Sequence, residues 1–313
     1  MRVSSDSNHS MTEAPGGEAI AVLDAIRHRV DEHLLEVAAR MEREVPGRLG
    51  EALAYALRSP GKRVRPALLV AAYQACGGSH PGISGLAASV EIVHTYSLVH
   101  DDLPSMDNDA LRRGRPTTHV AFDVSTATRV GYLLVPVAAE ELVRAAKLME
   151  LDDDTVGALA RRLFEAGGIR GMVGGQWLDL EAEGKHLDLP GLTTVHQGKT
   201  GALIAAAVMI GALAAGAPGT TLDALEEFGS EIGLAFQVAD DVLDATGSSG
   251  VLGKTAGKDA EVAKSTYVGL LGVDQARAEA LRHCRLALGA LERAGVEPGG
   301  LAPLARYIVT RSS

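Results

Sequence analysis

The sequence predicts an all-α protein with a single domain. Aromatic residues make up only 4% of its 313 residues, and β-branched residues do not alternate with polar ones, so strand signals are nearly absent. Long segments rich in Ala, Leu, Glu and Arg, with helical periodicity, run between short breaks of Gly and Pro. No composition shift or long linker divides the chain. We therefore expect one all-α domain over residues 18–313, after a disordered N-terminal arm over the polar residues 1–17.

The first predicted helix covers residues 18–45, because Ile20, Leu23, Ile26 and Val30 recur on one side of it. Similar apolar periodicity predicts the helices that follow. They are expected over residues 48–58, 63–76, 83–102, 117–148, 152–169, 171–183, 191–216, 220–246, 259–271, 273–294 and 300–311.

Residues 201–217 form the most apolar run of the chain and carry no charge. A membrane-spanning helix needs about 20 such residues, so the run is borderline in length. Lys199 leads directly into the run and Pro218 ends it. We interpret it as a helix buried on all sides in a large helical core, and we expect no membrane span.

Charge and cysteine content narrow the classes of function. The formal net charge of -10 argues against nucleic-acid binding. The N-terminal residues lack the apolar stretch of a secretory signal, and Cys76 and Cys284 show no metal-ligand spacing. We therefore expect a cytoplasmic protein with reduced thiols.

A first acidic cluster, Asp101, Asp102 and Asp107, follows the apolar segment 86–99. Carboxylates at the end of a buried helix need a counter-charge. Asp101 and Asp107 would lie on different sides of a regular helix, but Pro104 disfavours helix just before it. We expect the chain to loop there and bring Asp107 back toward Asp101. Alone, this cluster is equally compatible with a solvated helix end and with a metal site.

A second acidic cluster consists of Asp240, Asp241 and Asp244, with Gln237 one turn before it. Asp240 and Asp244 are four residues apart and share a helix face. Three acids interleaved with apolar residues are unusual for a surface. Carboxylates without Cys or His partners suit Mg²⁺ better than Zn²⁺. Two such clusters in one chain predict a site that holds several Mg²⁺ ions.

Basic residues cluster next to acidic residues and glycines, which is unexpected in a protein with a negative net charge. They occur in 61–66 (GKRVRP), in 111–115 (LRRGR), and in the pairs Lys199-Thr200 and Lys254-Thr255. Each alone is compatible with a solvated charge run, but together with the acidic clusters they indicate anion-binding sites. The two Lys-Thr pairs lack the spacing of a nucleotide-binding P-loop, so we reject that function.

With these motifs in this order, the sequence resembles the trans-prenyltransferase family, also called polyprenyl or isoprenyl diphosphate synthases. The resemblance extends from about residue 18 to Arg311. Its motifs are GKRVRP at 61–66, EIVHTYSLVHDD at 91–102, LRRG at 111–114, GMVGGQ at 171–176, Lys199-Thr200, FQVADDVLD at 236–244 and Gly253-Lys254. It implies an isoprenoid-synthase-type helical bundle around a central cavity, and we also expect a homodimer.

The resemblance implies a Mg²⁺-dependent head-to-tail condensation of isopentenyl diphosphate with an allylic diphosphate, dimethylallyl or geranyl, with three Mg²⁺ ions. The implied metal site comprises Asp101, Asp102, Asp107, Asp240, Asp241 and Asp244. The implied contacts of the allylic diphosphate are Arg112, Lys199, Thr200, Gln237 and Lys254. Those of isopentenyl diphosphate are Lys62, Arg65, His94 and Arg113.

Product length can be predicted from helix geometry. A growing chain that runs along the helix ending at Asp101 would extend by about one isoprene unit for each turn of about 5.4 Å. Tyr96 and Ser97 lie about one turn away, and the bulky Tyr96 would act as a floor. Tyr96 and the two extra residues inside the first cluster resemble bacterial farnesyl diphosphate synthases. A core role for Tyr96, a geranylgeranyl product, and a competing floor at Tyr132 with Arg129 remain alternatives.

Two further classes are disfavoured. A terpene cyclase also uses acidic clusters and Mg²⁺, but it would not need an isopentenyl diphosphate site at Lys62, Arg65 and Arg113. A non-catalytic partner subunit would typically lose the first acidic cluster, which this chain keeps.

Overall fold

The computed structural model describes residues 17–246 and 265–311. Its α-helices are α1 Gly17–Glu44, α2 Arg48–Leu57, α3 Val64–Ala75, α4 Ile83–Asp101, α5 Thr118–Ala121, α6 Val124–Leu148, α7 Asp153–Gly167, α8 Met172–Glu181, α9 Leu189–His196, α10 Ala202–Ala214, α11 Gly219–Thr246, α13 Tyr267–Leu271, α14 Val273–Arg293 and α15 Leu301–Thr310. A π-helical turn, η1 Gln197–Gly201, joins α9 to α10. The strands β1 Leu111–Arg112 and β2 Arg115–Pro116 form an antiparallel pair.

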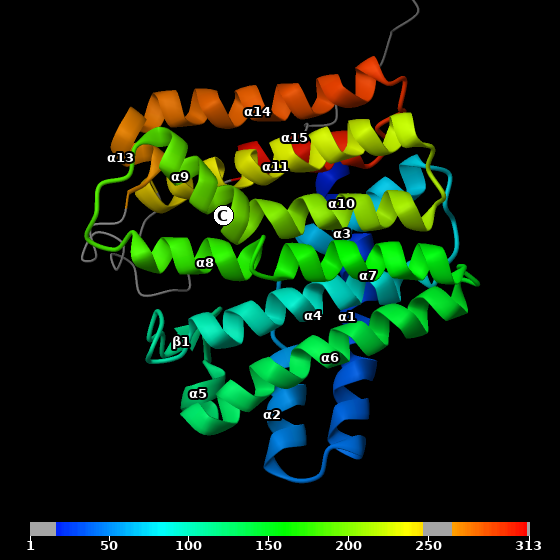
Figure 1. The fold of residues 1–313 in the computed structure, drawn as a ribbon, viewed down its shortest axis with the longest axis vertical. Coiled ribbons are helices and arrows are strands. Elements are labelled where there is room, and N and C mark those ends of the chain that lie inside the picture. The colour runs from blue at the N-terminus through cyan, green and yellow to red at the C-terminus, as the bar shows by residue number, and fades with distance from the viewer. Residues whose placement is uncertain (1–16, 247–264, 312–313) are drawn as a thin grey trace, which may run out of the picture.

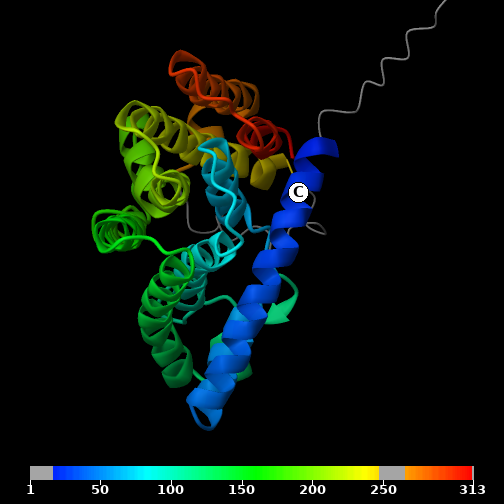
Figure 2. The same cartoon turned by 90° about the vertical axis from the view of Figure 1, so that its right-hand side faces the viewer.

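Most helices stack in rows that run nearly parallel across the molecule (Figure 1). α14 packs on α11, α11 packs on α10, and α10 packs on both α3 and α7. α4 in turn contacts α3 and α6. α1 runs along one side of these rows, with α2 beside its lower end (Figure 2). The described residues thus confirm the all-α fold class.

The helix α10 lies in the centre of the core. Leu203, Ile204, Val208 and Ile210 are fully buried, and Gly211 lets the helix approach the backbone of α3 closely. Among the described residues, the helical stretch Leu189–Ala214 is long and apolar enough to cross a membrane, but 61% of its most apolar window is buried inside the structure. The predicted core position of this apolar run is confirmed.

One predicted helix is interrupted, and that prediction was wrong in detail. The helix expected over 117–148 is divided into α5 and α6, and the Asp123 carboxylate caps α6 by accepting a hydrogen bond from the backbone N of Thr126 at 2.7 Å. The helix expected over 191–216 is continuous over Leu189–Ala214 and contains the π-helical turn η1. Of the helix expected over 259–271, residues 259–264 lie outside the described residues, Ser265 and Thr266 are not helical, and Tyr267–Leu271 form α13.

The β1–β2 pair is a local departure from the all-α prediction. It makes a tight hairpin, in which Arg113 and Gly114 adopt positive φ angles of 53° and 75°. Gly114 tolerates this conformation, whereas Arg113 is strained in it. The predicted disordered arm, residues 1–17, lies outside the described residues except for Gly17, which begins α1.

Candidate active site

A cavity of about 400 Å³ opens between α4, α8 and η1. This volume lies within the range of about 300–1,000 Å³ typical of small-molecule sites. Seven predicted site residues line it: Arg65, His94, Tyr96, Ser97, Asp101, Lys199 and Thr200. The rest of the lining is mostly apolar: His100, Met106, Ile169, Met172, Val173, Gln176, Trp177 and Leu180. One end of the cavity is therefore charged, and α8 provides an apolar wall.

The first acidic cluster forms the loop that the sequence predicted. The backbone N of Asp107 donates a hydrogen bond to the backbone O of Asp101 at 2.8 Å, and that of Asn108 donates to Leu103 at 3.0 Å. The chain after α4 therefore turns back and brings Asp107 next to Asp101. Burial raises the pKa of Asp101 to about 6; the Lys199 cation opposes this shift, and the carboxylates of Asp107 and Asp102 add to it.

Lys199 and Thr200 reach the cavity from the π-helical turn η1. A Cβ atom on Gly175 of α8 would overlap the backbone N of Lys199, so α8 and η1 pack backbone to backbone. The Lys199 Nζ lies 2.7 Å from Asp179 on α8. Burial alone would lower the pKa of Lys199, but the carboxylates of Asp179 and Asp101 keep it above its usual value. Lys199 is thus a positively charged side chain, fixed by its ion pair with Asp179, beside the first acidic cluster.

Arg65 and His94 face the same cavity from α3 and α4. The Arg65 Nε is buried and has no hydrogen-bond partner within the part of the chain that the structure describes. Burial lowers the pKa of His94 well below its usual value, and the neighbouring guanidinium groups of Arg65 and Arg113 lower it further. Lys62 lies nearby, and burial and the Arg311 cation lower its pKa. These groups form a positive region suited to an anion.

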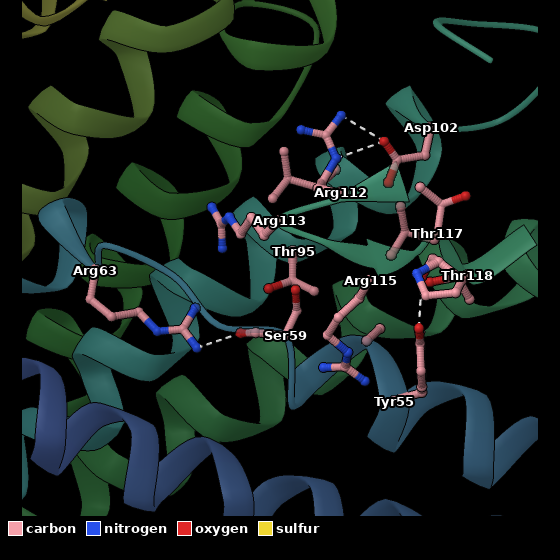
Figure 3. Close-up of a pocket in the computed structure, with 14 residues that line it drawn as sticks. Tyr55, Ser59, Arg63, Thr95, Asp102, Arg112, Arg113, Arg115, Thr117 and Thr118 are labelled. Atoms are coloured by element: carbon pink, nitrogen blue, oxygen red, sulfur yellow. Dashed lines mark hydrogen bonds and ion pairs between the residues drawn. The ribbon is translucent and has the colours of Figure 1, made fainter. Parts of the chain in front are cut away.

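The β1–β2 hairpin holds the two remaining arginines, beside a small cavity of about 40 Å³ against α2 and α4. Arg112 turns toward Asp102, and its Nε donates a hydrogen bond to that carboxylate at 2.6 Å, whereas Arg113 projects in another direction (Figure 3). Arg113 also donates to the backbone O of Pro60. Arg112 and Asp102, which the sequence assigned to two different ligands, are thus paired with each other.

Sequence reasoning missed the buried role of Arg63, the third cation of the segment 61–66. Its Nη1 donates a hydrogen bond to Glu91 at 2.6 Å, its Nε donates to Asp31 at 2.7 Å, and its Nη2 donates to the backbone O of Ser59 at 2.8 Å. Arg63 also has a left-handed φ of 51°. These contacts hold the backbone at Arg63, the residue between Lys62 and the start of α3, which carries Arg65. The signal was Glu91, an acid placed inside the apolar run of α4.

The second acidic cluster lies on α11, next to the cavity rather than in its lining. Arg311 donates a hydrogen bond to Asp240, and its guanidinium stacks over the Phe236 ring at 4.2 Å. Asp241 accepts a hydrogen bond from the backbone N of Tyr267 at 2.7 Å. Arg65, which lines the cavity, is close enough to Asp240 for that carboxylate to raise its pKa against the larger lowering by burial. Arg65 thus links the cavity to this cluster.

Within residues 17–246 and 265–311, no three His, Cys, Asp or Glu side chains already converge as a metal site. The donor set nevertheless fits Mg²⁺, because both clusters offer only oxygen ligands and the turn after α4 brings two carboxylates together. Gln237 lies 3.3 Å from Asp241. Lys254, the last predicted diphosphate contact, lies outside the described residues.

Tyr96 and Ser97 line the cavity as predicted, whereas the competing floor residue Tyr132 does not. The Tyr96 ring contacts the His100 ring edge-on at 5.1 Å, and the His100 ring also contacts the Tyr132 ring at 5.4 Å. Tyr132 is 67% exposed. Of these two tyrosines, Tyr96 is the one that lines the cavity.

Gln176 is a second residue that sequence reasoning left without a role. It lines the cavity and is buried, yet neither its side-chain oxygen nor its nitrogen has a hydrogen-bond partner in residues 17–246 and 265–311. Buried amides without partners are rare and point to a missing ligand or water. Its place in the GMVGGQ motif at 171–176 was the available signal.

Comparison with known proteins identifies the family. The sequence pattern of the polyprenyl synthetases matches residues 46–293. The chain belongs to the polyprenyl synthetase family. The farnesyl diphosphate synthase of Escherichia coli K12 is 44% identical over 266 residues, which cover 84% of this chain and 89% of that protein. The chloroplastic geranylgeranyl pyrophosphate synthase of Capsicum annuum is 40% identical over 272 residues, covering 86% of this chain and 73% of that protein.

Solved structures agree with this membership. The geranyltransferase of Helicobacter pylori, whose crystal structure is complexed with magnesium and isoprenyl diphosphate, has a TM-score of 0.78 and 31% identity, covering 96% of this chain and 98% of that one. The resemblance predicted from the two acidic clusters and the segment 61–66 is therefore confirmed. As a polyprenyl synthetase, the chain has the helical fold of the isoprenoid synthases.

Proposed function

We propose that this polyprenyl synthetase condenses isopentenyl diphosphate head to tail with dimethylallyl or geranyl diphosphate and releases farnesyl diphosphate as its main product. One observation carries the proposal. The cavity combines a carboxylate, Asp101, and a held cation, Lys199, at one end with an apolar wall on α8 and the Tyr96 ring on α4. Such a cavity suits a substrate with a diphosphate head and a hydrocarbon tail.

The charged end supports departure of the diphosphate. As the allylic carbon–oxygen bond breaks, negative charge grows on the leaving group, and Lys199 and Arg112 would stabilise it electrostatically. Thr200 and Gln237 would orient the same group by hydrogen bonds. Lys254 would complete this set. Asp101, Asp107 and Asp240 would be the principal ligands of three Mg²⁺ ions, and Asp102, Asp241 and Asp244 would act nearby. When bound, Mg²⁺ would neutralise the departing diphosphate.

The apolar wall protects the cationic carbon that remains. Met172, Val173 and Leu180 line this part of the cavity and would keep water away from that carbon. Lys62, Arg65 and Arg113 would hold isopentenyl diphosphate by its own diphosphate, with neutral His94 beside it. The isopentenyl double bond then forms the new carbon–carbon bond, a proton is lost to the departing diphosphate, and the longer allylic diphosphate results.

Geranylgeranyl diphosphate is the second candidate product. The plant relative that forms it is nearly as similar to this chain as the farnesyl enzyme. Tyr96 favours the shorter product, because its ring occupies the cavity wall beside the small Ser97.

Product sizing tests the proposal. The purified full chain is incubated with Mg²⁺, isopentenyl diphosphate and each allylic primer, and the products are dephosphorylated and separated by length. A main product of fifteen carbons supports the farnesyl assignment, and one of twenty carbons supports the second candidate. No elongation of any primer would overturn the proposal.

A cytoplasmic homodimer completes the proposed function. An exposed apolar stripe supports the dimer, since Tyr132, Pro136 and Val143 lie four and seven residues apart on α6 and so share one face. Light scattering of the purified chain gives the mass of the assembly. A monomer at micromolar concentration would contradict this part of the proposal.

A further inference from the structure

Tyr267 lies outside the cavity, at the point where α9, α11, α13 and α14 meet. It begins the five-residue helix α13 and is only 2% exposed. It belongs to a small hydrophobic cluster with Leu192 of α9, Val238 of α11 and Ala276 of α14. Tyr267 does not line the cavity, so any influence on the reaction must act through other residues.

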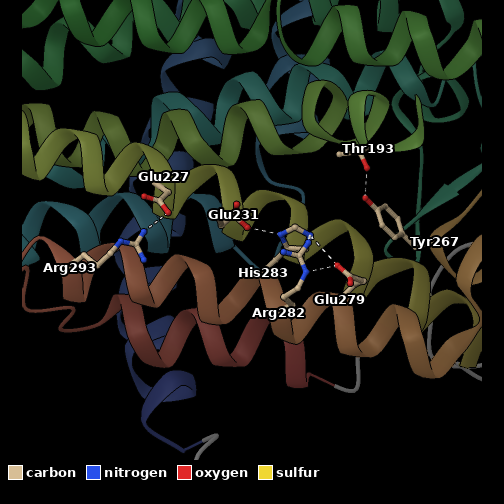
Figure 4. Close-up of polar contacts among 8 residues, drawn as sticks. All are labelled: Thr193, Glu227, Glu231, Tyr267, Glu279, Arg282, His283 and Arg293. Atoms are coloured by element: carbon tan, nitrogen blue, oxygen red, sulfur yellow. Dashed lines mark hydrogen bonds and ion pairs between the residues drawn. The ribbon is translucent and has the colours of Figure 1, made fainter. Parts of the chain in front are cut away.

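Three directed contacts hold Tyr267 in place. Its backbone N donates a hydrogen bond to Asp241 of α11 at 2.7 Å. Its ring stacks on His196 of α9, with centroids 5.6 Å apart and an angle of 30°. Its hydroxyl lies 2.6 Å from the Thr193 hydroxyl of α9 (Figure 4). Because Thr193 already donates its hydrogen to the backbone O of Leu189, Tyr267 is the donor of this bond.

Thr193 and His196 lie on one face of α9, directly before the π-helical turn that carries Lys199 and Thr200. Glycines of two neighbouring helices pack closely against the turn: Gly175 of α8 lies on one side of it, and a Cβ on Gly233 of α11 would lie only 2.7 Å from Gly201. The turn is part of the continuous helical stretch Leu189–Ala214, so contacts that fix α9 also restrain the turn. Tyr267 makes such contacts with Thr193 and His196.

We propose that Tyr267 is a positioning residue that orients the η1 turn, so that Lys199 and Thr200 face the cavity, and ties this turn to the acidic helix α11 through Asp241. The inference rests on the proposed function and extends it, since it names a residue outside the site that sets the geometry of the allylic diphosphate contacts. No sequence motif of the site included Tyr267.

Tyr267→Phe tests the inference because it keeps the ring, its burial and the backbone bond to Asp241, and removes only the hydroxyl. We expect the KM for geranyl diphosphate to rise about three- to tenfold, the effect of one lost neutral hydrogen bond. The KM for isopentenyl diphosphate should stay within about twofold. The melting temperature should change by only a few degrees. A purely structural role would instead lower stability and affect both substrates alike.

Matched variants sharpen the test. Thr193→Val should reproduce the effect, and the double variant should be no worse than either single one, because both remove the same bond. Thr194→Val is the control, since Thr194 is exposed and its hydroxyl donates a hydrogen bond to the backbone O of Pro190 at 3.0 Å, whereas Thr193 is the hydroxyl partner of Tyr267. An unchanged KM for geranyl diphosphate in Tyr267→Phe, or an equal rise for both substrates, would overturn the inference.

A binding measurement separates this inference from the proposed function. Calorimetry with geranyl thiolodiphosphate, an allylic analogue that ionises slowly, reports the diphosphate contacts without turnover. Weaker analogue binding by Tyr267→Phe supports the positioning role even if the wild-type chain elongates no primer, in which case the proposed function alone fails. Equal binding by both proteins would reject the positioning role even if the wild-type chain is fully active.

Discussion

Arg65 is the residue at which the two halves of the site meet. It lines the cavity, its Nε has no hydrogen-bond partner among the described residues, and the Asp240 carboxylate acts on it from α11. A guanidinium held in this way is suited to an anionic ligand.

Arg65→Ala should raise the KM for isopentenyl diphosphate roughly ten- to hundredfold and that for the allylic primer far less. A hydrogen bond to a charged group contributes about 1.5–3 kcal/mol, which corresponds to this range. Steady-state kinetics with each substrate varied in turn measure the split. Lys147→Ala, at an exposed position at the end of α6, should leave both constants unchanged. A larger effect on the allylic substrate would reverse the assignment of the two diphosphate sites.

Tyr96 should control product length. Tyr96→Ala should open space along α4 for one more isoprene unit, whose burial contributes a few kcal/mol, about 0.8 kcal/mol for each methylene. The main product should then lengthen from fifteen carbons to twenty or more, with similar turnover. Tyr132→Ala is the matched control, because Tyr132 is exposed and its ring contacts His100. A longer product from Tyr132→Ala but not from Tyr96→Ala would place the floor on α6.

At the scale of the elements, one buried carboxylate ties α6 to α1. Glu141 of α6 accepts hydrogen bonds from His33 and Arg40 of α1, both at 2.7 Å. Burial alone would raise the pKa of Glu141, but these two hydrogen bonds hold it below its usual value of 4.5. The ionised form therefore stabilises the fold above about pH 4.5, and this contribution is lost as the pH falls through the lower folded-state pKa.

Glu141→Gln should lower the free energy of unfolding by roughly 2–3 kcal/mol at pH 7, below the usual range for a broken buried pair because Arg40 and His33 remain partly hydrated. Urea titrations at pH 7 and at pH 4 measure the difference between wild type and variant. That difference should shrink at pH 4, where the wild type has begun to lose the same contribution. If the wild type and the variant differ in free energy of unfolding by the same amount at both pH values, the charge of Glu141 is not the source of the stabilisation.

The interruptions of the elements show what helical periodicity cannot predict. Apolar periodicity alone did not separate α5 from α6, whereas the Asp123 side chain caps the start of α6 by accepting a hydrogen bond from the backbone N of Thr126. The η1 turn depends on backbone contacts with glycines of α8 and α11. Such contacts join residues distant in the chain, so no local pattern in 191–216 announces them.

At the scale of the whole molecule, features set by neighbouring residues in the sequence could be predicted, whereas contacts between residues far apart in the sequence could not. Pro104 predicted the loop that returns Asp107 to Asp101, because proline acts on its immediate neighbours. The cavity itself gathers Arg65, Asp101 and Lys199 from three separate elements. Family resemblance named these residues. The places of Gln176 in the cavity lining and of Arg63 in its buried network depend on tertiary packing, which could not be predicted from the sequence.

The central claim is that the acidic end of the cavity drives departure of the allylic diphosphate. The most direct measurement is the turnover of Asp101→Asn with geranyl and isopentenyl diphosphates at a fixed, modest Mg²⁺ concentration. Asp223→Asn serves as the control, because Asp223 is exposed near the start of α11. We predict that Asp101→Asn loses several orders of magnitude in turnover while its circular dichroism spectrum and melting temperature match the control. Near-normal turnover of Asp101→Asn would contradict the account.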